Sequence, residues 1–125
     1  MKNLEKTAKI LSISAMLMGV FVGVLVFIFA LLSGSEAYGG GFMGILKNSP
    51  NALPWLVFLA TIWLAWKWPL LGGILLNILG IFSLFFFVFS SPVFHWPVFV
   101  LSIIIMSIGC LFLASWYLSA NKKKP

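Results

Sequence analysis

The feature that most constrains this chain is the near absence of charge from four long apolar stretches. They cover residues 10–32, 53–66, 69–90 and 97–118. Lys67 is the one charged residue between Leu53 and Leu118, and it lies at the break between the second and third stretches. Bilayer hydrocarbon is roughly 30 Å thick, so a helix needs about 20 apolar residues to cross it. Three stretches reach that length and the second is marginal, which predicts one all-α integral membrane domain over residues 1–125.

Composition excludes an ordinary soluble domain. Hydrophobic residues make up 62% of the chain, whereas soluble globular domains contain about 45–50%. In water, a chain of this length would expose large apolar patches. The first stretch is also longer than the roughly 7–15 apolar residues of a secretory signal. We therefore expect it to remain as a helix, although Ser33–Ala37 has the small residues of a cleavage site.

The eight lysines predict the orientation of the helices. Three precede the first stretch, Lys67 follows the second, and three lie in the tail at 122–124. Lys47 is alone in the two remaining loops. Because cytoplasmic loops of membrane proteins carry the excess of basic residues, we predict an antiparallel up-down four-helix bundle. Both termini and the Lys67 turn are expected on the cytoplasmic side.

Small residues predict which helix faces pack together. Two lines of small or polar residues have helical spacing: Ala15, Gly19 and Gly23 in the first stretch, and Gly73, Asn77 and Gly80 in the third. Lipid provides no hydrophobic drive between helices, so small residues favour packing by letting backbones approach closely. We expect the Gly19 face to meet the Asn77 face at the centre of the bundle. Homodimerisation through the Gly19 face is the alternative.

Aromatic residues and one lysine mark the expected membrane boundaries. Indole rings favour the membrane–water interface, and a lysine there can extend its ammonium group to the headgroups. The predicted interface anchors are Trp55, Trp66, Lys67, Trp68, Trp96 and Trp116. Pro69 cannot continue a helix, which predicts a tight reversal at Lys67. Within the loop at 33–52, residues 42–47 could lie on the interface as one or two helical turns.

No group of residues indicates catalysis, a cofactor or a metal. The chain has no Asp and no Arg, and His95 and Cys110 are the only residues of their kinds. A metal site needs several such ligands. Glu36 and His95 both lie in predicted outer loops, so a pair between them is geometrically possible. The lysines come with no basic face or aromatic platform for nucleic acid. We therefore expect a non-enzymatic protein whose surroundings are the lipid bilayer.

The predicted spans also contain no residue suited to proton coupling. Coupled transport generally requires ionisable residues that face a cavity within the membrane. Asn77 is the only amide at membrane depth, where it can act as a hydrogen-bonding link between helices or line a polar site. Small multidrug exporters have a similar length and four helices, but they rely on a membrane-embedded carboxylate. The absence of that carboxylate argues against such an exporter.

The segment from Trp63 to Leu75 is similar to a segment of other membrane proteins. It contains Trp66, Lys67, the Trp68-Pro69 pair and the Gly72-Gly73 pair. It resembles a group of uncharacterised small prokaryotic membrane proteins in which a tryptophan, a basic residue, Trp-Pro and Gly-Gly join the second and third helices. The resemblance implies a four-helix prokaryotic membrane protein of unknown function, and it assigns no active residue.

These observations favour an accessory, assembly or regulatory subunit of a prokaryotic cytoplasmic membrane. The alternative is a pore-forming or permease-type oligomer similar to a holin. Either function would bring a membrane-protein partner or further copies of the chain. Ser49-Pro50 and Ser91-Pro92 precede the second and fourth stretches, so the chain could also be a duplicated helical hairpin.

Overall fold

The computed structural model describes residues 2–90 and 92–121, and this part of the chain is helical without strands. The all-helical prediction is thus confirmed. The elements are α1 (Lys2–Ser33), η1 (Ser35–Tyr38), α2 (Gly41–Asn48), η2 (Ser49–Ala52), α3 (Leu53–Lys67), α4 (Pro69–Ser83), η3 (Leu84–Phe89) and α5 (Trp96–Asn121). Here η1 and η2 are 3₁₀ helices, and η3 is a π-helical continuation of α4. The main departure from the predicted boundaries is α1, which begins at Lys2 instead of near Ile10.

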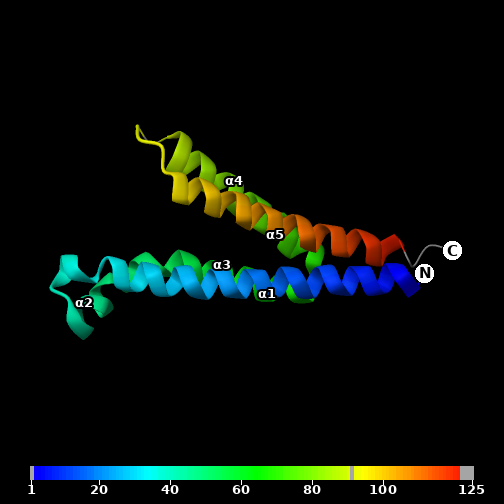
Figure 1. Cartoon of the computed structure of the whole chain (residues 1–125), viewed down its shortest axis with the longest axis horizontal. Coiled ribbons are helices and arrows are strands. Elements are labelled where there is room, and N and C mark those ends of the chain that lie inside the picture. The colour runs from blue at the N-terminus through cyan, green and yellow to red at the C-terminus, as the bar shows by residue number, and fades with distance from the viewer. Residues whose placement is uncertain (1, 91, 122–125) are drawn as a thin grey trace.

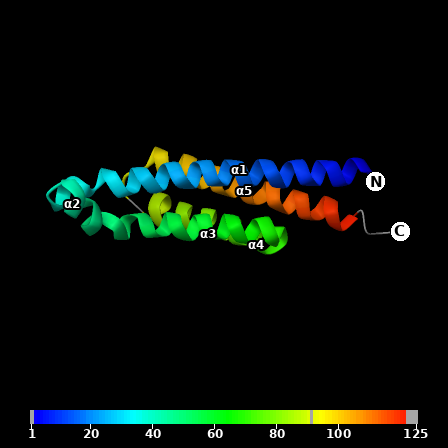
Figure 2. The ribbon, with the colours of Figure 1, turned by 90° about the horizontal axis from the view of Figure 1, so that it is seen from below.

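The long helices form two antiparallel pairs, α1 with α3 and α4 with α5 (Figure 1). The pairs are joined side by side, because α1 also contacts α5 and α3 also contacts α4. Figures 1 and 2 place the start of α1 and the end of α5 at the same end of the molecule. The pairs diverge toward the opposite end, where α2 and the η3–α5 connection lie (Figure 1). The core between the pairs consists of buried apolar residues: Ala15, Phe58, Ile62, Ala65, Leu76, Ile105, Ile108 and Phe112.

Glycines set the contacts, but not between the helices that we expected. A Cβ atom added at Gly19 would lie 2.5 Å from Ile62 Cδ1, and one at Gly23 would collide with Leu59, both in α3. The expected meeting of the Gly19 face with the Asn77 face is therefore wrong. Elements that follow one another in the chain are usually adjacent in space, and α3 is the first long helix after α1, so it covers the Gly19 face. The Gly19 face therefore packs against a helix of the same chain.

The second line of small residues closes α4 against α5. A Cβ atom added at Gly73 would lie 2.9 Å from the Gly109 carbonyl oxygen, and one at Gly80 would lie 3.1 Å from that of Ser102. Asn77 lies between them and also faces Gly109. Close backbone approach of this kind is the main source of helix packing in lipid. The α4–α5 pair is thus built on the Asn77 face.

The reversal between α3 and α4 is the tightest point of the fold. Trp68 ends α3 with a non-helical backbone (φ −129°, ψ 83°), and Pro69 begins α4. Proline suits a first helical position because the N–H that it lacks has no intrahelical partner there. One turn later, Gly72 lies directly against the backbone of Ala65, with no space for a side chain. The packing at the reversal therefore requires glycine at position 72.

We predict that Gly72→Ala destabilises the protein even though alanine normally favours a helix over glycine by roughly 1 kcal/mol. The added methyl group would meet the Cα and Cβ atoms of Ala65, which cannot move without opening the reversal. Overpacking of this kind costs about 1–3 kcal/mol. The measurement is thermal unfolding in detergent.

Gly19→Ala is the matched control for this prediction. Its new methyl group would meet side-chain atoms of Ile62, which can shift more easily than the backbone that Gly72 meets. We expect a smaller loss of melting temperature than for Gly72→Ala. An equal or larger loss for the control would show that the reversal is not the tightest contact.

Candidate functional site

Polar side chains of the long helices are engaged in packing. Asn77 donates from Nδ2 to the Gly73 carbonyl oxygen (2.9 Å) within α4. The Ser102 hydroxyl bonds the Val98 carbonyl oxygen (2.8 Å) and lies 2.9 Å from the Ser83 hydroxyl. Among the described residues, no buried side-chain nitrogen or oxygen lacks a hydrogen-bond partner. The Ser102–Ser83 bond joins α5 to α4, whereas the Asn77 and Val98 bonds stay within one helix.

Asn48 forms a junction that sequence reasoning missed. It is only 1% exposed, and its Nδ2 donates to the carbonyl oxygens of Ala30 (2.9 Å) and Leu31 (2.7 Å). Its Oδ1 accepts a hydrogen bond from Asn51. Carbonyl groups in the last turn of a helix have no intrahelical partner. The Asn48 side chain, at the end of α2, thus supplies hydrogen-bond donors to carbonyl groups at the end of α1. The residues around Asn48 favour a turn or a helix start, and nothing local points to a partner so far back in the chain.

We predict that Asn48→Ala loosens this junction, because the Ala30 and Leu31 carbonyl oxygens lose their donor. Leaving buried polar groups unpaired costs about 1–3 kcal/mol. Hydrogen exchange should accelerate in α2 and the last turn of α1 while α4 and α5 stay protected. Asn51→Ala, which removes the other member of the amide pair, should have a smaller effect. Unchanged exchange in Asn48→Ala would contradict the assigned role.

The predicted boundary residues lie in two groups. Lys67, Trp66 and Trp68 are exposed at the α3–α4 reversal. The Lys67 ammonium lies 4.5 Å from the ring centroid of Trp63, one turn earlier, in a cation–π contact. Trp96 and Trp116 are exposed near the two ends of α5. Trp55 is half-buried and meets Phe58 edge-on at 5.8 Å. The role of these residues as membrane anchors stays a prediction.

The possible Glu36–His95 pair falls on two separate parts of the molecule. Glu36 belongs to η1 at the end of the α1–α3 pair, whereas His95 immediately precedes α5. The tips of the two helix pairs lie apart in Figure 1. Within residues 2–90 and 92–121, no group of three His, Cys, Asp or Glu residues could hold a metal ion.

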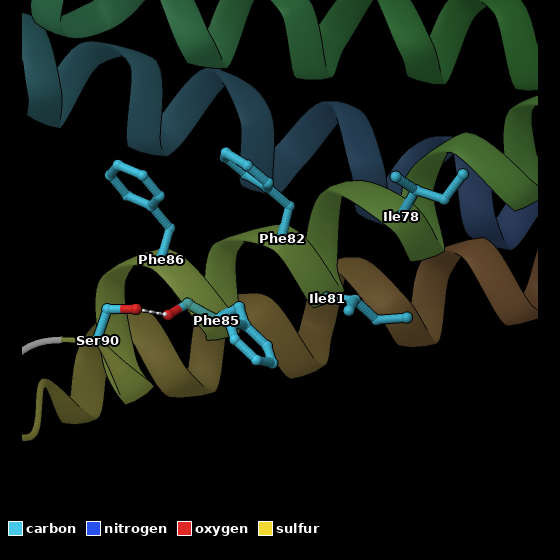
Figure 3. Close-up of a pocket in the computed structure, with 6 residues that line it drawn as sticks. All are labelled: Ile78, Ile81, Phe82, Phe85, Phe86 and Ser90. Carbon is cyan, nitrogen blue, oxygen red and sulfur yellow. Dashed lines mark hydrogen bonds between the residues drawn. The ribbon is translucent and has the colours of Figure 1, made fainter.

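An open hollow lies on the outer part of α4 and η3 (Figure 3). It has a volume of about 400 Å³ and is lined by Ile78, Ile81, Phe82, Phe85, Phe86 and Ser90. The rings of Phe82 and Phe86 stack with centroids 5.4 Å apart. The one polar side chain, Ser90, donates to the Phe85 carbonyl oxygen at 2.7 Å. Since its lining is apolar and this hydroxyl is engaged, the hollow suits hydrocarbon and not a polar substrate.

The outward face of α5 differs from the outward face of α1. Exposed residues recur there every three or four positions, as on one side of a helix: Val100, Ile103, Ser107, Cys110, Ala114 and Tyr117. We call this line the α5 stripe. Its centre is small, whereas the outward face of α1 carries leucine, valine, isoleucine and phenylalanine side chains. Ser107 donates to the Ile103 carbonyl oxygen (2.8 Å), and the free thiol of Cys110 lies 3.7 Å from Asn77 Oδ1.

Three helical segments of the described chain are long and apolar enough to cross a membrane: Asn3–Tyr38, Pro69–Phe89 and Trp96–Ala120. The structure therefore defines an all-helical protein whose apolar helices are compatible with a membrane protein. The chain belongs to the family of the domain of unknown function DUF7670, whose profile matches residues 3–125. This membership is consistent with the resemblance to an uncharacterised group. No curated protein and no solved structure matches the chain.

Proposed function

We propose that this protein is a non-enzymatic, four-crossing protein of a prokaryotic cytoplasmic membrane. It acts as an accessory, assembly or regulatory subunit by packing a transmembrane helix of another membrane protein against the α5 stripe. The observation that carries this proposal is the exposed run of Ser107, Cys110 and Ala114. Small residues let a second helix approach closely, which is how helices associate in lipid.

The use of the other small residues supports this surface. Gly19 and Gly23 of α1 are covered by α3, and Gly73 and Gly80 of α4 are covered by α5. The remaining outward faces of the long helices present mainly bulky apolar side chains, which suit contact with lipid tails. A partner helix would thus find its closest approach along α5. A non-enzymatic role is supported by the engagement of Asn77 and Ser102 in packing.

The arrangement of the helices supports four crossings, although α3 has only 15 residues. Helices α1 and α4 run in the same direction in Figure 1, so the chain must return between them. At about 1.5 Å per residue, α3 rises about 22 Å, which is less than the roughly 30 Å of hydrocarbon. Local bilayer thinning or tilting of neighbours accommodates such a mismatch at modest cost.

We predict that both chain ends and Lys67 face the cytoplasm. In a Cys110→Ala background, Ala37→Cys and Phe94→Cys should react with an impermeant maleimide from outside intact cells. Lys67→Cys and Lys122→Cys should react only after the membrane is opened. Cytoplasmic loops carry the basic excess, which is the reason for this direction. Labelling of position 67 from outside would reverse the topology.

We predict that a photo-crosslinker at Ser107 gives one discrete adduct with another membrane protein in native membranes. The same group at Val24, on the outward face of α1, should give only lipid adducts. Ser107→Leu with Ala114→Leu should abolish an adduct made from Ile103, because the larger side chains keep the partner backbone away. Equal protein adducts from positions 24 and 107 would overturn the proposal.

Two further measurements distinguish the alternative, a pore-forming oligomer, from the accessory role. Cys110 lies in the centre of the α5 stripe, so mild oxidation would link two copies that meet through it. A disulfide-linked dimer, together with dye release from proteoliposomes, would favour a pore over the accessory role. We expect neither result.

A further inference from the structure

Helix α2 lies across the end of the α1–α3 pair instead of along it, as the two perpendicular views show (Figures 1 and 2). Its two faces differ sharply. Gly44 and Asn48, one turn apart, are buried against the rest of the chain. On the other side Phe42 is 74% exposed, Met43 61% and Leu46 48%. A short helix with this pattern has an apolar face that none of residues 2–90 and 92–121 covers.

Specific contacts fix the direction of this apolar face. A Cβ atom added at Gly44 would lie 2.6 Å from the Ser35 carbonyl oxygen, so α2 packs on η1 through bare backbone. At the other end, Asn48 is hydrogen-bonded to the last turn of α1. The entry to α2 is a turn in which Gly39, Gly40 and Gly41 all have positive φ, a conformation that favours glycine. The outward position of Phe42, Met43 and Leu46 is therefore built into the fold.

We propose that α2 is an interfacial helix that inserts Phe42, Met43 and Leu46 into the outer boundary of the lipid bilayer. The proposal rests on the membrane location given above and adds a lipid-binding surface to it. Interfacial helices lie in the membrane plane with their apolar face buried about 5–10 Å into the headgroup and acyl boundary. A helix set across α1 has the required direction when α1 crosses the membrane.

The depth of α2 also favours lipid as the occupant. From Ile10 to Leu32, α1 rises about 33 Å, close to the roughly 30 Å of hydrocarbon. Leu32 is itself exposed, so the apolar surface of α1 continues to this boundary. Helix α2 packs on η1, which follows directly after α1. The apolar face of α2 thus follows the exposed apolar surface of α1 after one short helix, and the charged Lys47 lies in the last turn of α2.

This placement also bears on the short helix α3. The segment η2 leads directly from Asn48 into Leu53, so the chain would enter α3 from within the boundary layer. A helix that begins there has less hydrocarbon to cross than one that begins in water. Helix α2 would thereby compensate for the length that α3 lacks.

The test uses two neighbouring positions that face different directions. In a Cys110→Ala background, Leu46→Cys and Lys47→Cys are labelled with an environment-sensitive fluorophore and reconstituted into phosphatidylcholine vesicles. We expect position 46 to be quenched by lipids with a nitroxide near the headgroup and to be about threefold less accessible to iodide than position 47. Equal access of iodide to both positions would place the α2 face in water and overturn the proposal.

Two further measurements separate the other outcomes. A fluorophore at Phe21→Cys, on the outward face of α1, reports the membrane location itself. Quenching at position 21 by deep nitroxide lipids without quenching at 46 would refute the α2 proposal alone, whereas no quenching at 21 would refute the proposed membrane function. If position 46 is open to iodide in pure lipid but protected in native membranes, a protein covers α2 and the lipid proposal fails.

Discussion

The fold depends on the close approach of helices at glycine. In a membrane the hydrophobic effect cannot drive apolar helices together, because lipid tails are as apolar as the side chains. Close packing must then hold the helices together, and this chain places a glycine at three of its contacts between long helices: Gly19 between α1 and α3, Gly72 between α3 and α4, and Gly73 between α4 and α5. The other residues of these helices can face lipid without weakening the bundle.

The distribution of small residues is the reason for proposing the α5 stripe as a contact surface. Within the long helices α1, α4 and α5, the glycines are turned inward, and Ser107, Cys110 and Ala114 form a run of small residues that is turned outward. The polar character of Ser107 does not oppose contact with lipid, because its hydroxyl is bonded to its own helix. The same surface can therefore face lipid when alone and a helix when a partner is present.

The sequence predicted the helices well and their contacts less well. Apolar length and the position of Pro69 placed α3 and α4 closely, because these signals are local. The pairing of Gly19 with Asn77 failed, since a small-residue stripe tells that a helix approaches but not which one. Asn48 was missed for a related reason: its partners in α1 are 17 and 18 residues away, and no local pattern encodes that distance. The α5 stripe could not be predicted from the sequence, because it is defined by the faces of α5 that α1 and α4 cover.

The hydrogen bond from Ser115 to the Ala8 carbonyl oxygen joins residues 107 positions apart, at 2.7 Å. Helix α1 extends beyond the α3–α4 reversal, and there its neighbour is α5 (Figure 1). During synthesis, the α1 segment around Ala8 is made long before α5, so its packing is complete only when α5 is in place. A chain truncated after α4 would lack this hydrogen bond and the contact of α1 with α5, while α3 could still cover Gly19 and Gly23. The stability of the Ala8 end of α1 is thus coupled to the last helix of the described chain.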